Sequence, residues 1–120
     1  MDVVRARNVT RETIVAERVE VADTSQARKR GLLGRDGLAP NSGLWLVPCE
    51  WVHMFGMKFP IDIVVLDKND CVVGVQEALK PGWIGKIFWR AHSTLELPPG
   101  AIQSSRTQKG DRIQWEEHGG

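Results

Sequence analysis

The most chemically suggestive part of the sequence is the run from Trp51 to Asp67, which places a histidine, two methionines and an aspartate among large apolar residues. A histidine and a carboxylate are side chains that commonly exchange protons near neutral pH. Imidazole and thioether groups together also suit a soft metal such as Cu(I). The run therefore allows acid–base chemistry, ligand or metal binding, or a purely structural role.

Asp62 is the residue of this run that most needs a hydrogen-bond or charge partner. It stands between Ile61 and Ile63 in an apolar, strand-like stretch, where an unpaired carboxylate is costly and must be satisfied by a partner. In one interpretation it accepts backbone N–H groups from the irregular segment before it and only fixes that loop. In the other it pairs with Lys58, His53 or an arginine at the floor of a cleft, where a shifted pKa would suit acid–base work.

His53 has a structural and a functional interpretation of its own. In an extended chain it would share one face with large apolar side chains, Trp51, Phe55, Met57 and Phe59. A lone histidine in such a place is usually a hydrogen-bonded core group. As a general base it would be oriented by Asp62 or Glu96, and it would need a nucleophile such as Ser93 or a water molecule.

A metal site in the same run is a weaker interpretation. Cys49, Met54 and Met57 could join His53 around a soft metal. However, the Cys-x3-His spacing is not a zinc pattern, and Met54 and Met57 would face opposite ways in a strand. Methionines more often fill irregular gaps in a core. We therefore predict no metal and no cofactor, and the sequence contains no G-x-x-x-x-G-K-[ST] phosphate loop.

A second apolar segment, from Trp83 to Trp89, follows a Pro-Gly break. It could close over a pocket as a flap, dock a partner as an exposed patch, or pack into the core. We place a candidate ligand pocket between this flap and the His53 to Phe59 segment. The ligand-binding residues predicted for it are His53, Met57, Lys58, Asp62, Trp83, Trp89 and Arg90. A polar rim of Lys58, Lys86, Arg90 and His92 would favour a polar or anionic ligand.

The elements that must position these residues follow from periodicity and turn signals. A weak capping box at Asp23 and Gln26, with Gly34 beyond it, predicts one short helix over about residues 24–33. Predicted strands cover residues 13–21, 44–47, 61–66, 71–77, 91–97 and 112–116. The polar turn at residues 67–70 predicts a hairpin of two strands that are apolar on both faces, so both faces should be covered.

These elements predict a mainly β fold, a small sandwich or barrel of about six to eight short strands with one short helix. The length of 120 residues predicts a single domain over residues 1–120, with residues 1–10 and 117–120 frayed. The net charge of +1 argues against nucleic acid as a partner. Two cysteines without a CxxC pair, no apolar leader and no spanning segment predict a cytoplasmic protein.

Several motifs together resemble those of a known family. They are the segment from Asp23 to Arg35, the His-Met-Phe-Gly-Met-Lys-Phe-Pro-Ile-Asp-Ile-Val-Val-Leu-Asp run from His53 to Asp67, the Leu-Glu-Leu-Pro-Pro-Gly turn from Leu95 to Gly100, and Lys109 to Arg112. In type, order and spacing they resemble the bacterial and archaeal family called domain of unknown function 192, over about residues 13–116. The resemblance implies a small mainly β fold with one helix. It implies no activity, substrate or cofactor.

Three hypotheses follow for the function. The first is a module that binds a small polar or anionic molecule, or a protein partner, at residues 53–62 and the flap at residues 83–90. The second is a hydrolase-like enzyme that uses His53 and Asp62 as acid–base residues, which requires both side chains on the same side of the sheet. The third is a motif that only stabilises the fold. The residues do not fix the oligomeric state.

Overall fold

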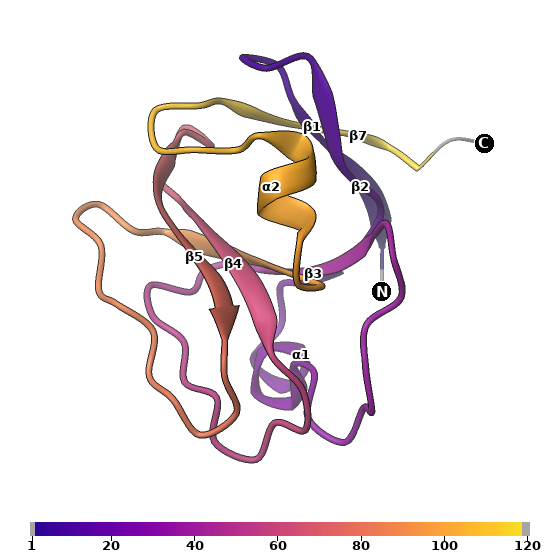
Figure 1. Ribbon diagram of the computed structural model, residues 1–120, viewed down its shortest axis with the longest axis vertical. Coiled ribbons are helices and arrows are strands. Elements are labelled where there is room, and N and C mark those ends of the chain that lie inside the picture. Colours follow the sequence, from indigo (N-terminus) through magenta and orange to yellow (C-terminus); the bar gives the residue numbers. More distant parts are fainter. Residues whose placement is uncertain (1, 119–120) are drawn as a thin grey trace.

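The computed structural model describes residues 2–118 as one curled, seven-stranded sheet with two short helices. The strands, in chain order, are β1 Val3–Asn8, β2 Thr13–Ala22, β3 Ser42–Leu46, β4 Ile61–Leu66, β5 Val72–Leu79, β6 Ser93–Leu97 and β7 Ile113–Glu117. Their order across the sheet is β5-β4-β6-β3-β2-β1-β7 (Figure 1). All neighbouring strands are antiparallel except β2 and β3. The prediction of a mainly β, barrel-like fold is therefore confirmed.

The sheet curls until its two edges meet at one end. An isolated bridge joins Cys71, just before β5, to Arg112, just before β7. Beside it, Val72 N donates to Asp111 O at 2.7 Å and Gly110 N donates to Val72 O at 2.8 Å. The two edge strands share few other contacts, so the sheet forms a half-barrel that is tied together at one end.

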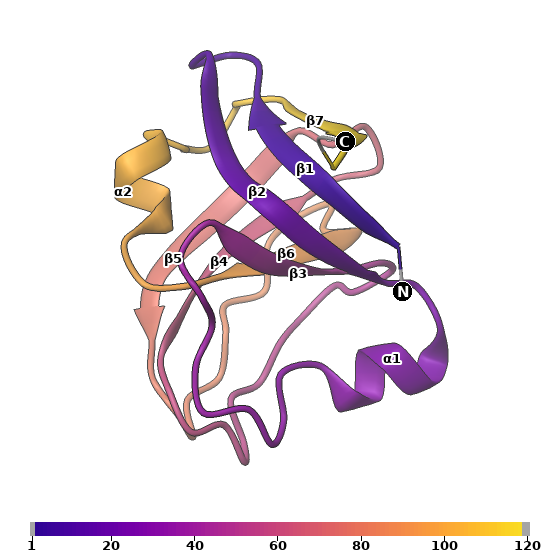
Figure 2. The same ribbon diagram turned by 90° about the vertical axis from the view of Figure 1, so that its right-hand side faces the viewer.

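Each face of the sheet has its own apolar core. The concave face packs around Val19, Val64 and Leu95 and is covered by α2, Ala101–Ser105. The other face packs around Leu44, Ile63 and Met54. It is covered by residues of the segment 47–60 and of the flap, and α1, Ser25–Arg30, stands at its edge (Figure 2). All six residues of β4 are buried, which confirms that this strand of the predicted hairpin is covered on both faces. The edge strand β5 is buried only in part, so the prediction is wrong for that strand.

Three details of the predicted elements are corrected. The helix α1 begins at Ser25 and ends at Arg30, because Thr24, not Asp23, accepts the capping hydrogen bond from Ala27 N and because Gly31 already ends it. A second helix, α2, follows the Pro-Pro-Gly turn.

No helix in residues 2–118 is long and apolar enough to cross a membrane.

Residues 2–10 are also not a frayed end. Residues from Val3 to Asn8 form β1, which lies between β2 and β7 in the sheet. Glu117 belongs to β7, and the expected fraying of residues 1, 119 and 120 lies outside the described residues. Sequence periodicity missed β1 because Arg5 and Arg7 alternate with apolar residues only over a short run at the chain end.

Candidate functional site

Asp62 is satisfied entirely by backbone groups. Its Oδ1 accepts from Ala78 N at 2.8 Å, and its Oδ2 accepts from Gly100 N and Ile102 N at 3.1 Å each. Ala78 has a left-handed φ of 50° at a bulge of β5, so the carboxylate holds this bulge and the start of α2 together. The side chain is fully buried. The prediction that Asp62 accepts backbone N–H groups is therefore confirmed. The prediction that these groups come from the segment before Asp62 is wrong, because they belong to β5 and to the start of α2.

The same contacts separate Asp62 from His53. The carboxylate points to the concave face, where Ile102 packs, whereas the neighbours of His53, Val52 and Met54, pack on the other face. The predicted pairing of His53 with Asp62 in one site is therefore wrong. The lone-core interpretation of His53 is also wrong, because its side chain is exposed.

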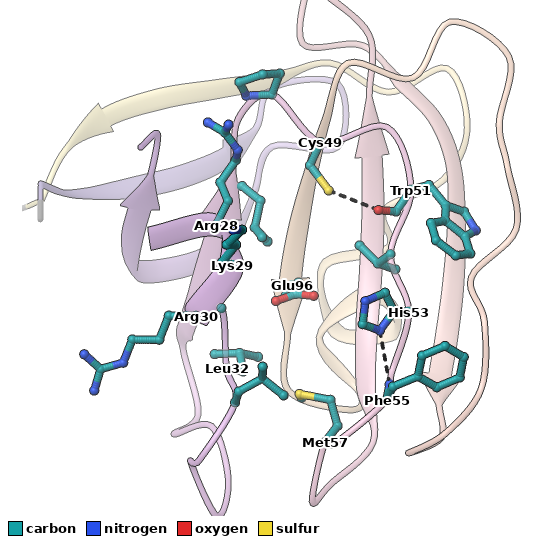
Figure 3. A pocket seen from close by; sticks show the side chains of 15 residues that line it. Arg28, Lys29, Arg30, Leu32, Cys49, Trp51, His53, Phe55, Met57 and Glu96 are labelled. Atoms are coloured by element: carbon teal, nitrogen blue, oxygen red, sulfur yellow. Dashed lines mark hydrogen bonds between the residues drawn. The ribbon is translucent and has the colours of Figure 1, made fainter. Parts of the chain in front are cut away.

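A cleft of about 190 Å³ opens on the outer face, between α1 and the segment 47–57 (Figure 3). Three of the predicted site residues, His53, Met57 and Glu96, line it. Its other walls are Arg28, Lys29, Arg30, Gly31, Leu32, Leu33, Leu46, Pro48, Cys49, Trp51, Val52 and Phe55. The cleft therefore combines apolar and polar walls, with cations on the α1 side.

Glu96 reaches this cleft because of its place in β6. Leu95 and Leu97 point to the concave core, so the alternation of the strand turns Glu96 to the other face. Its two cross-strand neighbours there are Leu44 of β3 and Ile63 of β4, both buried and apolar. Figure 3 shows Glu96 in the middle of the cleft, with the α1 residues on one side and His53 and Met57 on the other.

Glu96 is the only residue of the cleft that is acidic. It is 7% exposed, and within residues 2–118 its carboxyl group has no hydrogen-bond or salt-bridge partner. Burial raises the pKa of Glu96 from 4.5 to about 7, and the charge of Arg35 opposes this only in part. Arg35 is itself paired with Glu20 at 2.7 Å. The carboxyl group therefore changes its charge near neutral pH.

The segment 47–57 forms the second wall and is fixed by backbone contacts. Cys49 N donates to His92 O at 2.7 Å, and the hydroxyl of Thr94 donates to Cys49 O at 3.2 Å. His53 Nδ1 accepts from Phe55 N at 3.3 Å, and the two rings stack with centroids 4.8 Å apart. In the neutral imidazole the proton is then on Nε2, which leaves an N–H donor at the rim of the cleft.

The helix α1 supplies the first wall and its positive charge. Arg28 is half-buried and donates to Asp23 O at 3.2 Å and to Val47 O at 3.5 Å, so it links the helix to the end of β3. Lys29 and Arg30 are exposed. In Figure 3 the guanidinium of Arg30 points away from Glu96. The helix thus offers cations to the mouth of the cleft without neutralising the carboxyl group at its floor.

Cys49 lies in the same cleft but is chemically quiet. Its thiol donates to Trp51 O at 3.4 Å, and burial raises its pKa, so it stays protonated and is a poor nucleophile or metal ligand. Cys71 is also a free thiol. Within residues 2–118 no group of three or more His, Cys, Asp or Glu side chains is arranged to hold a metal ion.

The flap does not form the predicted pocket with the His53 segment, because the two segments pair along their backbones. His53 and Ile84 form an isolated antiparallel bridge, Met54 N donates to Trp83 O at 2.8 Å, and Gly85 N donates to Val52 O at 3.0 Å. The cleft lies on the opposite side of the 47–57 segment, against α1.

The remaining predicted ligand residues lie outside the cleft. Lys58 is exposed and pairs with Asp36 at 3.4 Å. Trp83 is 55% exposed with Lys80 Nζ above its ring, and Trp89 is 84% exposed beside Arg90. Conversely, the basic residues of α1 line the cleft but were not predicted as ligand residues, because a charge run on a short helix usually faces solvent. Their spacing carries no signal of the long-range contact with residues 47–57.

The fold and the cleft together define a small mainly β domain with a buried carboxyl group at the floor of a cleft that has both apolar and cationic walls. The chain belongs to the family DUF192, described as Uncharacterized ACR, COG1430, whose sequence profile matches residues 6–115. The resemblance drawn from the motifs is therefore confirmed, and the family assigns no activity.

Relatives and solved structures agree with this assignment. The UPF0127 protein of the archaeon Thermococcus sibiricus is 32% identical over 117 residues, which cover 91% of this chain and 73% of that protein. A UPF0127 protein of Pyrococcus horikoshii is 34% identical over 103 residues, which cover 81% of this chain and 86% of that protein.

Two crystal structures share the fold. One is a proposed transcription regulator of Sinorhizobium meliloti, with a TM-score of 0.78, 22% identity, and coverage of 95% of this chain and 92% of that one. The other is a protein of unknown function from Novosphingobium aromaticivorans, with a TM-score of 0.78, 20% identity, and coverage of 94% of this chain and 84% of that one. At these identities the likeness shows the fold alone.

Proposed function

We propose that this protein binds a small molecule in the cleft between α1 and the segment 47–57, with Glu96 as the group that recognises it. The observation that carries the proposal is the carboxyl group of Glu96, which is buried, lacks a partner within residues 2–118 and faces a cleft. A buried carboxylate without a partner is costly, and a ligand that donates a hydrogen bond or a positive charge to it removes that cost.

The shape and charge of the cleft define the class of ligand. The volume of about 190 Å³ is below the roughly 300–1,000 Å³ of sites for drug-sized ligands, so the occupant is the size of a small metabolite. Leu32 and Met57 favour an apolar body, and Glu96 favours an amine. Arg28 and Lys29 at the mouth favour an anionic group at the opposite end. A small zwitterion with an apolar middle fits all three demands.

A screen by ¹H–¹⁵N NMR tests this function directly. The fragments are amines, carboxylic acids, amino acids and neutral sugars, at pH 6 and pH 8. We expect amino acids with apolar side chains to shift the amides of residues 28–33 and 49–57, with tighter binding at pH 8, where Glu96 is ionised. The variant Glu96→Gln should weaken this binding about tenfold or more, as loss of a charged partner does. Glu77→Gln, an exposed glutamate on β5, is the matched control.

The proposal fails if no fragment class shifts the cleft amides, or if Glu96→Gln binds the same fragments as tightly as the parent. A preference for carboxylic acids without an amine would contradict the role of Glu96 and would support only the role of the α1 cations.

The two free thiols, Cys49 and Cys71, support the cytoplasm as the compartment of this activity.

Acid–base catalysis in the same cleft is the second candidate, and one observation favours it. Glu96, with its pKa raised to about 7, and the exposed His53, with its Nε2 donor, line one cleft, which suits proton transfer near neutral pH. Turnover of a cleft-binding ester or amide, lost in both Glu96→Gln and His53→Ala, would support this candidate. Binding without turnover would exclude it for those substrates.

A further inference from the structure

The flap at residues 83–90 displays an unusual set of exposed apolar side chains. Trp83 and Ile84 are each 55% exposed, Ile87 is 81% exposed and Trp89 is 84% exposed. Trp51 and Phe55, on the segment paired with the flap, are also exposed, at 42% and 52%. Large apolar side chains that are exposed together on one segment mark a candidate binding surface.

The flap is held in place, so this exposure is not the result of a loose loop. The backbone of the flap pairs with residues 52–54. In addition, Gly85 O accepts from the indole N–H of Trp51 at 2.8 Å, and Lys86 N donates to Gln76 Oε1 at 2.6 Å. Phe88 anchors it from inside, where its ring occupies the space that a side chain at Gly74 would need. The flap therefore presents its outer side chains from a fixed base.

The charges around these side chains are almost all positive. Lys80, Lys86 and Arg90 are exposed, and none of them forms a salt bridge with another residue in the range 2–118. Between Glu77 and Glu96 the chain contains no acidic residue. One acid from another segment, Glu50, lines a shallow hollow with Ile87, Trp89 and Arg90. The surface therefore complements an anionic partner that also accepts apolar groups.

We infer that the flap docks on the surface of an anionic lipid bilayer. Tryptophan favours the membrane–water interface because its ring is apolar and its N–H is polar. Isoleucine side chains that protrude singly, as Ile87 does, enter a fluid interface more readily than a rigid protein surface, which must provide a matching hollow for each. Lysine and arginine beside them are attracted to anionic headgroups. Insertion of apolar side chains and attraction of basic side chains are each weak, but together they give stable membrane association. Trp51 and Phe55 also line the cleft, whereas no residue of the flap does, so the inference depends on the flap residues themselves.

Flotation with lipid vesicles tests the inference on the full chain. Vesicles of phosphatidylcholine alone are compared with vesicles that contain about 30 mol% phosphatidylglycerol. We expect binding to be about tenfold tighter or more to the anionic vesicles, to weaken in high salt, and to shift the tryptophan emission to shorter wavelength. The double variants Ile87→Ser with Trp89→Ser and Lys86→Gln with Arg90→Gln should each weaken it about tenfold. Ile14→Ser, an exposed apolar residue on β2, is the matched control.

Three results would overturn the inference. The first is no flotation with anionic vesicles at millimolar lipid by a protein whose circular dichroism shows it to be folded. The second is flotation that both flap variants retain in full. The third is a dimer in sedimentation equilibrium that Trp89→Ser dissociates, with no vesicle binding, because this result would assign the flap to a second copy of the chain.

Discussion

Two buried carboxyl groups, Asp62 and Glu96, occupy opposite faces of the same sheet and have opposite roles. Asp62 accepts three backbone hydrogen bonds and holds α2 to β4 and β5. Glu96 has no such partner in residues 2–118 and faces the cleft. The sequence alone predicted that Asp62 must be satisfied. It could not rank Glu96 above Asp62, because only the folded sheet shows which carboxyl group meets backbone donors and which meets a cleft.

The contrast predicts different effects of substitution on stability. Asp62→Ala removes a fully buried acceptor from three N–H groups, one of them on the buried Ile102, so it should lower the free energy of unfolding by about 3 kcal/mol. Asp62→Asn keeps one acceptor oxygen and should cost less. Urea unfolding of both variants measures this difference. A loss below about 1 kcal/mol in Asp62→Ala would contradict the structural role assigned to the carboxylate.

Glu96 predicts a dependence of stability on pH. Its pKa is raised from 4.5 to about 7 in the folded state, so the folded protein retains this proton to a higher pH than the unfolded chain does. The contribution of this group to the free energy of unfolding therefore falls as pH rises from about 4.5 to about 7 and is constant above that. The total fall is at most about 3 kcal/mol.

The variant Glu96→Gln isolates this contribution, because it has no proton to lose. It should match the parent in stability near pH 4 and exceed it by up to about 3 kcal/mol at pH 8. Urea unfolding of both proteins across this pH range provides the comparison, with Glu77→Gln as the control. Equal stability at pH 8 would mean that Glu96 is solvated or paired in the folded protein.

The elements differ in how far local sequence determines them. The hairpin of β4 and β5 follows from apolar runs around a polar turn, and it was predicted with nearly correct bounds. The helix α1 was predicted too long, since Gly31 already ends it. β1 and α2 are short, and neighbours distant in sequence hold both of them in place, so local periodicity carries little signal for either.

The flap depends on a single glycine for its inner anchor. A Cβ at Gly74 would stand 2.1 Å from the ring of Phe88, so Gly74→Ala must displace the ring and loosen the flap. We expect a loss of about 1–3 kcal/mol in the free energy of unfolding, with a change in tryptophan fluorescence. Gly37→Ala is the control, because nothing lies within 4 Å of its Cβ position. A Gly74→Ala protein as stable as this control would show that Phe88 does not anchor the flap.

At the scale of the molecule, the sheet of the half-barrel provides most of the stability, and α1 at its edge contributes to the candidate binding cleft. The strands β4 and β6 are buried on both faces, whereas α1 buries none of its residues and forms one wall of the cleft. A rigid sheet thus carries Glu96, and a lightly packed helix stands opposite it. Such an arrangement allows the cleft to adjust its width without loss of the fold.

Hydrogen exchange should show this division. The amides of Ile63, Val64 and Leu95 should exchange only through global unfolding, and those of α1 should exchange through local opening with a much lower free energy. A ligand in the cleft should slow exchange in α1 more than in β4. Equal protection of α1 and β4 in the free protein would contradict the division.

Glu96 is a buried carboxyl group that has no partner among residues 2–118 and changes its charge near neutral pH. The most direct test is a ¹³C NMR titration of the glutamate side-chain carboxyl groups, with Glu96→Gln to assign the resonance. The structure predicts a pKa of about 7 for Glu96 in the free protein. A pKa near the ordinary 4.5 would contradict the claim, since it would mean that water or a protein partner already stabilises the charge.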